Sequence, residues 1–412
     1  MASVTTLNLR DIRCFAGEQS GRLARITLLV GANGAGKSTF LGCYKTLTRL
    51  ANLHKLDDEN YFDEAPFEMG GFDTIARTGC DAFSLGAEFA DHCHESLRFD
   101  FARANGSEPI EQKVRLGWND DYMDISRRAA ATESFLILNS RFSFALNRAY
   151  ISYAQVSTWL ARAVKYGHMP FNGDVASFRR SSRSVTEDDV IAFSRFISLL
   201  RSGLPLPVDE AFSVHALDPH LERRQRTYLL QPQLLPALDP EALAFLADLG
   251  KRLELWTDVR TKGEANGFAI LVDSVAGTHN LMDVGFGVHS MLPLARAIYE
   301  RPAHAMLLLQ QPEVHLHPEA QANLAQFMVE SQQGFLIETH SDHFLDRFRI
   351  SVMRKQLSTD DLSILYFEPV NDGSASVIHH IAVDESGNLI NVPRNFRSFF
   401  DREINALLGF ED

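Results

Sequence analysis

The segment that decides the fold is Gly31-Ala32-Asn33-Gly34-Ala35-Gly36-Lys37-Ser38-Thr39, which fits the pattern G-x-x-x-x-G-K-[ST] in full. An apolar run over residues 26–30 precedes it, and a helical pattern over residues 37–53 follows. Glycines let successive N–H groups point at a phosphate, and the helix start adds its positive dipole end. Lys37 supplies a cation, and the Ser38 hydroxyl can bind Mg²⁺. The segment predicts binding of a nucleoside triphosphate by Asn33, Gly34, Ala35, Gly36, Lys37, Ser38 and Thr39.

A second segment, Leu307-Leu308-Leu309-Gln310-Gln311-Pro312-Glu313-Val314-His315-Leu316-His317-Pro318, has the form of the second motif of an ATPase. Such a motif carries an acid at the end of a buried strand to hold Mg²⁺, and a second acid to orient the attacking water. Gln310 and Gln311 stand at these two places. A Gln amide accepts a hydrogen bond, but it supplies no negative charge and cannot act as a base. Nucleotide binding is therefore expected to survive, with hydrolysis impaired.

The hydrophobic pattern divides the chain into three parts. Residues 1–119 contain strand patterns, and the period-two alternation between residues 67 and 116 indicates an antiparallel sheet. Residues 120–260 have helical periodicity without sustained heptads and predict a helical insertion. The helical patterns in it cover residues 151–166, 187–201 and 241–259.

Short strand patterns return in residues 261–412 and alternate with helices. These patterns cover residues 267–275, 305–309, 334–338 and 361–367. Such alternation predicts a largely parallel sheet that the two ends of the chain build together. The expected fold class is α/β, with a mixed or parallel central sheet, a flanking antiparallel β subdomain and a helical insertion.

Composition limits the classes of function. The chain has 412 residues, 45% of them hydrophobic and 23% charged, as in folded soluble proteins. The formal net charge of −13 argues against a surface devoted to non-specific binding of DNA. No apolar run is long enough to span a membrane, and the first residues lack the pattern of a signal peptide. The four cysteines are scattered, as expected of reduced thiols in a cytoplasmic protein.

With these motifs the chain resembles RecF/SMC-like members of the ABC ATPase class, and among them compact bacterial AAA family ATPases with a Pro-Glu-x-His-Leu-His-Pro motif. It is similar to the ATPase half of the overcoming-lysogenization-defect nucleases and to ATPases of anti-phage systems. The resemblance covers roughly residues 1–90 and 265–400. It implies an ABC-type P-loop ATPase fold that uses ATP and Mg²⁺. It aligns Gln310 with the metal-organising acid and Gln311 with the general base.

The segment Asp283-Val284-Gly285-Phe286-Gly287-Val288-His289-Ser290-Met291-Leu292-Pro293 is similar to the signature segment of this class. In that class a Ser and a Gly at a helix N-terminus hold the γ-phosphate bound to the other subunit. The family has Ser-Gln where this chain has His289-Ser290, so the hydroxyl that caps the phosphate stays open. A Gly-rich strand-to-helix turn is the alternative interpretation. The nucleotide contacts that the resemblance implies here come from Gly285, Gly287, His289 and Ser290.

The segment Ile337-Glu338-Thr339-His340-Ser341-Asp342-His343 resembles the switch-histidine loop of the family. The resemblance implies that His340, at the end of a core strand, hydrogen-bonds the γ-phosphate and the attacking water. His315 and His317 are expected to shape the turn after the second motif rather than to bind metal.

Three interpretations of hydrolysis follow from the amides. Glu313 can swing in as the missing acid, or Gln311 can position the water without deprotonating it, as in small GTPases. One Gln can also be an engineered substitution that traps the nucleotide. We expect slow hydrolysis to which Glu313, Gln311 and His340 contribute, with Ser38 and Gln310 organising the metal.

Two classes of function fit these features. The first is a dimeric or higher-order ATPase that acts as sensor or scaffold in bacterial anti-phage defence, beside a separate effector protein such as a nuclease. The second is a DNA-repair or chromosome-maintenance ATPase that clamps DNA, which ATP-stimulated and salt-dependent DNA affinity would favour. A transporter subunit is a third reading, but the sequence shows no element that couples to a membrane.

Overall fold

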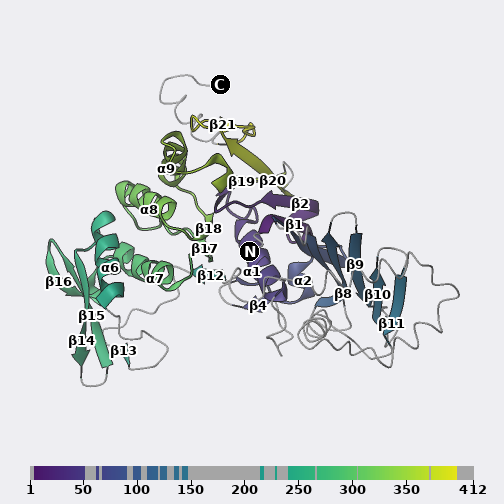
Figure 1. Cartoon of the computed structure of the whole chain (residues 1–412), viewed down its shortest axis with the longest axis horizontal. Coiled ribbons are helices and arrows are strands. Elements are labelled where there is room, and N and C mark those ends of the chain that lie inside the picture. The colour runs from purple at the N-terminus through teal and green to yellow at the C-terminus, as the bar shows by residue number, and fades with distance from the viewer. Residues whose placement is uncertain are drawn as a thin grey trace. The chain divides into compact units, whose positions relative to one another are not determined.

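The computed structural model describes most of the chain outside its middle (Figure 1). The described residues are 4–51, 62–64, 67–90, 96–103, 109–118, 121–127, 134–138, 142–146, 214–217, 228–229, 240–264, 267–303, 305–370 and 373–396. They belong to two compact units, each assembled from separate segments of the chain. The first unit is Met1–Arg22, Thr39–Phe212 and Pro369–Val377, and the second is Leu23–Ser38, Ser213–Glu368 and Ile378–Asp412.

The second unit contains a sheet whose central strands are parallel. Its order is β20-β19-β3-β18-β17-β12, and the pairs from β19 to β12 are all parallel. The strands are β3 (Ile26–Gly31), β12 (Val214–Leu217), β17 (Met306–Gln310), β18 (Gly334–Glu338), β19 (Leu362–Pro369) and β20 (Ser376–Val383). The predicted parallel sheet is confirmed. Because β18 lies between β3 and β17, the carboxyl ends of these three strands meet at one edge.

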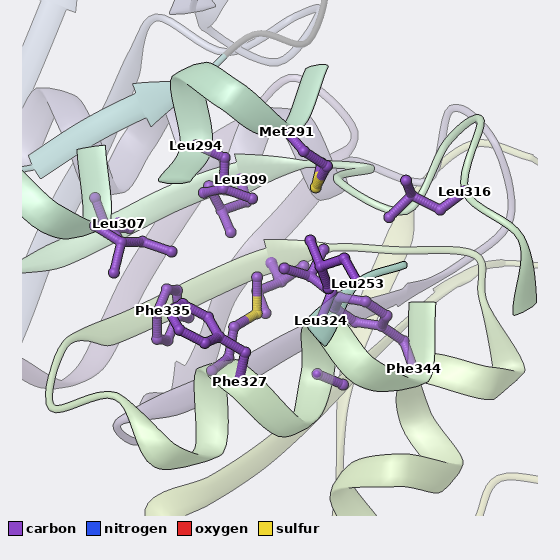
Figure 2. Close-up of a cluster of buried hydrophobic side chains, with 14 of the residues drawn as sticks. Leu253, Met291, Leu294, Leu307, Leu309, Leu316, Leu324, Phe327, Phe335 and Phe344 are labelled. Carbon is purple, nitrogen blue, oxygen red and sulfur yellow. The ribbon is translucent and has the colours of Figure 1, made fainter. Parts of the chain in front are cut away.

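Four helices pack around this sheet in the same unit: α6 (Pro240–Arg252), α7 (Phe286–Glu300), α8 (Pro318–Glu330) and α9 (Asp342–Met353). Figure 2 shows side chains of the strands facing those of the helices, among them Leu309, Phe335 and Leu324. Each of these three is at most 1% exposed, and full burial of such a side chain contributes about 1.5–3 kcal/mol. This apolar packing fixes the strand ends on which the site is built.

The starts of α8 and α9 are set by their caps. His317 accepts a hydrogen bond from the Glu319 N–H, and Pro318 occupies the first turn of α8. Ser341 accepts one from the Phe344 N–H at the start of α9. The expectation that His317 shapes the turn after the second motif is confirmed.

A separate antiparallel sheet in the second unit corrects one prediction. The run over residues 267–275 was expected in the parallel sheet, but β15 (Gly267–Ser274) pairs with three strands of an antiparallel sheet. Its partners are β13 (Tyr228–Leu229), β14 (Asp258–Glu264) and β16 (Gly277–Asn280). The short connections to β14 and β16 permit only hairpins, whereas a parallel neighbour needs a long crossover.

The first unit holds an antiparallel sheet of order β11-β10-β9-β8-β7-β6-β1-β2. Its strands are β1 (Val4–Ile12), β2 (Phe15–Arg22), β6 (Ala82–Phe89), β7 (Ser96–Arg103), β8 (Pro109–Trp118), β9 (Asp121–Arg127), β10 (Ser134–Leu138) and β11 (Phe142–Leu146). The predicted antiparallel sheet is confirmed. The strand pattern that begins at residue 4 does not form one strand: β1 ends at Ile12 and β2 begins at Phe15 as the second strand of a hairpin. Asp11, where the register of β1 shifts, and Arg13, in the turn, both have positive φ.

The predicted helical insertion over residues 120–260 is described only in part. Its first described residues are the strands β9, β10 and β11, so the antiparallel sheet extends past residue 120. The helix expected over residues 241–259 is present as α6 but ends at Arg252. The patterns at residues 151–166 and 187–201 lie outside the described residues.

Helix α1 (Lys37–Ala51) follows the phosphate loop, close to the predicted 37–53. The apolar side of this helix is buried, and its residues are Phe40, Leu41, Tyr44, Leu47 and Leu50. The remaining short elements are β4 (Asp63–Glu64), β5 (Phe67–Glu68), α2 (Phe72–Ile75), η2 (Leu281–Asp283), η3 (Thr359–Asp361) and β21 (Leu389–Ile390). No helix in the described part of the chain is long and apolar enough to cross a membrane.

Candidate nucleotide site

The phosphate loop joins the end of β3 to the start of α1, as the motif predicts. Gly36 has a φ of +101°, a backbone conformation that residues with a Cβ rarely adopt. The Lys37 ammonium is only 3% exposed and donates to the carbonyls of Gly31 (3.1 Å) and Ala32 (2.9 Å). Burial lowers the pKa of Lys37, and the nearby Glu338 opposes that shift. A buried ammonium at a helix start is suited to meet the negative charge of a phosphate.

Of the other predicted nucleotide ligands, three lie on the exposed or partly exposed rim of the loop. Asn33 and Gly34 are exposed, Gly36 is partly exposed and Ala35 is buried. Thr39, the third residue of α1, is buried and accepts a 3.4 Å hydrogen bond from Arg13 within the first unit. The loop therefore exposes much of its glycine-rich backbone and Ser38, while Lys37 and Thr39 are buried.

Glu338, at the end of β18, belongs to this site, although no sequence motif assigns it a role. Its Oε2 accepts a 2.7 Å hydrogen bond from the Ser38 hydroxyl, and its Oε1 lies 3.9 Å from the Lys37 ammonium. The side chain is buried, at 7% exposed. The sequence shows an acid at the end of a buried strand, just before Thr339 and His340. Whether that acid lies beside the phosphate loop depends on the order of the strands, which the sequence does not show.

Gln310 and Gln311 end the neighbouring strand β17, where the second motif predicts them. Gln310 is the register partner of Glu338 across the β17–β18 pair. The Gln311 N–H donates to the Glu338 carbonyl at 2.7 Å, and Gln311 has a φ of +45°. A positive φ at a residue with a long side chain is a strained conformation of the kind found at functional sites. The structure thus brings both amides to the edge of the sheet at which Glu338 ends the neighbouring strand β18.

Glu313 is also buried, at 5% exposed, but its carboxylate contacts a different segment. Its Oε1 accepts hydrogen bonds from the Thr339 hydroxyl (2.7 Å) and the His340 N–H (3.0 Å). Its Oε2 is buried without a hydrogen-bond partner among the described residues. Burial raises the pKa of Glu313, and the hydrogen bonds from Thr339 and His340 oppose that shift. As placed, Glu313 fixes the loop that carries His340, and its role as general base stays a prediction.

His340 follows β18 and Thr339, and its side chain is exposed. Partial burial and the positive charge of Lys37 lower its pKa, and Glu338 opposes that shift. The imidazole is therefore neutral at neutral pH, since even the unperturbed pKa is about 6.5. A neutral imidazole can donate one hydrogen bond and accept another. His340 can therefore supply both hydrogen bonds expected of a histidine between a phosphate and a water molecule, and that role stays a prediction.

A hydrogen-bond network ties the second motif to the His340 loop. Gln321 on α8 donates to the Leu316 carbonyl at 3.0 Å and accepts from the Ser341 hydroxyl. The Ser341 N–H donates to the Thr339 hydroxyl oxygen at 3.0 Å. These hydrogen bonds are partly buried, and the members of such a network gain strength because they polarise one another. The turn after the second motif and the loop after β18 are therefore positioned together.

The signature segment forms the start of α7, with Gly285 as its N-cap. A Cβ on Gly287 would lie 2.9 Å from the His315 carbonyl oxygen, so this helix start packs tightly against the turn of the second motif. His289 is buried, and the Ser290 hydroxyl donates to the Gly287 carbonyl at 3.2 Å. Free N–H groups of a helix start favour an anion. The predicted location at a helix N-terminus is confirmed, while the choice between His289 and Ser290 as phosphate cap stays open.

The donors at this edge fit a Mg²⁺ ion that is shared with a nucleotide. Mg²⁺ takes oxygen ligands and is bound in such sites by one or two carboxylates together with substrate phosphates. The Ser38 hydroxyl and the Glu338 carboxylate meet these requirements beside the phosphate loop. No group of three or more His, Cys, Asp or Glu side chains among the described residues forms a metal cluster. Phosphate oxygens and water molecules would complete the coordination of such an ion.

Comparison with known proteins adds a family match. Residues 26–346 match the family described as "AAA domain, putative AbiEii toxin, Type IV TA system". No curated protein matches the chain in sequence.

Several solved structures are similar to the chain. A crystal structure of an Smc head bound to the C-winged helix domain of ScpA has 13% identity, covers 93% of this chain and 98% of that chain, and has a TM-score of 0.42. The SMC head domain from Thermotoga maritima has 11% identity over 92% of this chain and 99% of that chain, with a TM-score of 0.41. An Smc head domain from Pyrococcus furiosus, bound to the C-terminal domain of ScpA, has 12% identity over 93% and 97%, with a TM-score of 0.41.

Proposed function

The chain belongs to the AAA-domain family matched over residues 26–346, and we propose that it is an ATPase that binds ATP with Mg²⁺ and hydrolyses it slowly. The observation that carries this proposal is the meeting of Lys37, Ser38 and Glu338 at the phosphate loop. Loop N–H groups, the Lys37 ammonium and the start of α1 would hold the phosphates. When bound, Mg²⁺ supplies positive charge that offsets the charge developing on the phosphates.

Slow hydrolysis follows from the chemistry at the end of β17. Neither Gln310 nor Gln311 can accept a proton, and loss of a positioned base commonly costs on the order of 10²–10⁴-fold in rate. Gln311 can still orient a water molecule through its amide. His340, neutral at neutral pH, can hydrogen-bond the same water or the γ-phosphate. These residues would position the attacking water without a strong base, so the ATP-bound state would be long-lived.

The test of this proposal is direct. ATP affinity and single-turnover hydrolysis are measured for the protein and for Lys37→Ala. We expect binding that requires Lys37, with slow turnover. Absence of ATP binding by the unaltered protein would refute the proposal.

We further propose that two chains sandwich the nucleotides, with the signature segment of one facing the phosphate loop of the other. The location of Gly285, Gly287 and Ser290 at the start of α7 supports this arrangement, because such a start offers N–H groups to an anion. The expected result is an ATP-dependent increase in molar mass in light scattering. Ser290→Ala should weaken that dimer and leave ATP binding to the monomer unchanged, whereas an ATP-independent mass would contradict the sandwich.

The biological role that we propose is bacterial anti-phage defence, as sensor or scaffold beside a separate effector protein. The family description names a putative AbiEii toxin of a Type IV TA system, which supports a role of this kind. Opening and closing of the ATP-bound assembly would signal to the effector. Partners are sought by affinity purification with and without ATP. A nuclease or other toxic effector retained with ATP would support the role, and ATP-stimulated retention of DNA alone would favour the DNA-clamping alternative.

A further inference from the structure

We propose that Glu338 supplies the carboxylate that organises Mg²⁺ in this site, in the role that Gln310 cannot fill. The second motif has lost its acid, but an acid stands one strand away at the same edge of the sheet. This inference rests on the proposed binding of ATP. It adds a metal ligand on β18, a strand in which no sequence motif places one.

The contacts of Glu338 already join it to the phosphate loop. Its Oε2 is 2.7 Å from the Ser38 hydroxyl, the group that the motif assigns to Mg²⁺. Its Oε1 is 3.9 Å from the Lys37 ammonium, which also donates to two loop carbonyls. The carboxylate therefore faces the metal-binding hydroxyl more closely than it faces the lysine. A Mg²⁺ ion between Ser38 and the phosphates would have this carboxylate beside it, directly or through a water.

The register of the sheet explains why an acid on β18 can replace the acid expected on β17. Gln310 and Glu338 are partners in neighbouring parallel strands, and such partners lie about 4.8 Å apart with side chains on the same face. Side chains at positions 310 and 338 can therefore reach the same region at the edge of the sheet. Two carboxylates at these positions would repel one another at this distance. With Gln310 as the partner, Glu338 has no like-charged neighbour on β17.

Glu338 could instead act only as a counter-ion for Lys37, and that role predicts a different dependence of ATP affinity on Mg²⁺. As a counter-ion for Lys37 alone, it would compete with the phosphates whether or not Mg²⁺ is present. As a metal-organising acid, it repels the phosphates without the metal and attracts the metal that accompanies them. The two roles therefore differ in how the Mg²⁺-dependence of ATP affinity responds to loss of the charge.

The experiment measures the affinity of a fluorescent ATP analogue with Mg²⁺ and with EDTA. The ratio of the two affinities, the Mg²⁺ enhancement, is compared for the full chain and for Glu338→Gln. We expect Glu338→Gln to reduce the enhancement on the order of 10–100-fold, the usual effect of altering the groups that orient a metal. Its affinity in EDTA should be unchanged or tighter, because a negative charge beside the phosphates is gone. Glu385→Gln, which alters an exposed acid of the same unit, serves as the control and should match the unaltered protein.

A second variant separates charge from packing. Gln has the size of Glu but no charge, whereas Glu338→Asp keeps the charge with one methylene fewer. We expect Glu338→Asp to retain more of the Mg²⁺ enhancement than Glu338→Gln, and thermal unfolding confirms that each variant is folded. If Glu338→Gln fails to fold, Glu338→Asp decides, because a reach shortened by one methylene should still lower the enhancement several-fold.

An unchanged Mg²⁺ enhancement in Glu338→Gln, or in Glu338→Asp where only that variant folds, would overturn the inference and leave the proposed ATP binding intact. Absence of ATP binding by the unaltered protein, with Mg²⁺ and with EDTA, would instead remove the proposed function on which the inference rests.

Discussion

Two buried carboxylates at the same edge of one sheet differ in what they hold. Glu338 is 7% exposed and contacts Ser38 of the phosphate loop, whereas Glu313 is 5% exposed and contacts Thr339 and His340. Burial is alike, so burial alone does not separate a metal ligand from a positioning residue. The hydrogen-bond partners distinguish the two roles. Glu338 faces the phosphate loop, whereas Glu313 holds the loop that carries His340. The charge missing at Gln310 and Gln311 is thus still present in the site, on the adjacent strand.

The largest expected effect on the hydrolysis rate comes from removing the carboxylate at position 338 and restoring one at position 310. Glu338→Gln should slow single-turnover hydrolysis on the order of 10²–10³-fold, the cost of removing one group that stabilises charge in a transition state. Adding Gln310→Glu to that variant returns a carboxylate to the register partner of residue 338 and should restore part of the rate. No recovery in the double variant, with both proteins folded, would show that the two positions do not address the same ion.

Replacing Glu313 is expected to have an intermediate effect that depends on the substitute. Glu313→Ala leaves the Thr339 hydroxyl and the His340 N–H without their acceptor, at a cost of about 1–3 kcal/mol in the free energy of unfolding. A loosened His340 should lower the hydrolysis rate about tenfold or more. Glu313→Gln keeps an amide oxygen as acceptor and should retain most of the rate.

Chemical denaturation and single-turnover kinetics of both variants provide the measurement. Equal loss of hydrolysis in Glu313→Gln and Glu313→Ala would show that Glu313 acts as a base, because only a base needs the carboxylate itself.

A substitution at Gly287 is expected to disturb the surroundings of Glu313 but not those of Glu338. A Cβ there would lie 2.9 Å from the His315 carbonyl, whereas a Cβ on Gly285 has nothing within 4 Å. Gly287→Ala should displace the turn after Glu313 and destabilise the fold by about 1–3 kcal/mol. Gly285→Ala, the matched control, should change stability by about 1 kcal/mol or less. The Mg²⁺ enhancement of ATP affinity should stay the same in both, and its loss in Gly287→Ala would couple the two acids.

The smallest expected effect is a dependence of stability on pH. Burial raises the pKa of folded Glu313 above the unfolded value of 4.5, so between these two values the folded state binds more protons than the unfolded state. Stability contributed by Glu313 is therefore present at low pH and is lost as pH rises through the raised pKa. Thermal unfolding across this window should show the unaltered protein losing stability relative to Glu313→Gln. A constant difference between the two proteins would contradict the raised pKa.

Local patterns predicted much of the unit that carries the site. The phosphate loop, the strand from Gly334 to Glu338 and the helix N-terminus at Gly285 each follow from a few consecutive residues. What local patterns could not give is the neighbour of each strand. Glu338 belongs to the site only because β18 lies between β3 and β17. This strand order brings it to Ser38, which is 300 residues away in sequence.

The same limit explains the errors in the fold. The run over residues 267–275 reads as a strand in either kind of sheet, and only its hairpin partners make it antiparallel. The hairpin of β1 and β2 has positive φ at Asp11, within β1, and at Arg13, in the turn, instead of at glycines, so the sequence lacks the usual signal for a hairpin. For Glu313, the residue type predicts a base, and that role stays a prediction; the hydrogen bonds from Thr339 and His340, which strand order creates, support the alternative of a positioning role.

The central claim is that Glu338, and not Glu313, supplies the acid on which ATP turnover depends. Single-turnover hydrolysis of ATP by the unaltered protein, Glu338→Gln and Glu313→Gln tests it most directly, because each variant removes one negative charge at nearly constant size. We predict that Glu313→Gln stays close to the unaltered rate while Glu338→Gln falls on the order of 10²–10³-fold. The reverse order, with Glu338→Gln active and Glu313→Gln inactive, would contradict the account.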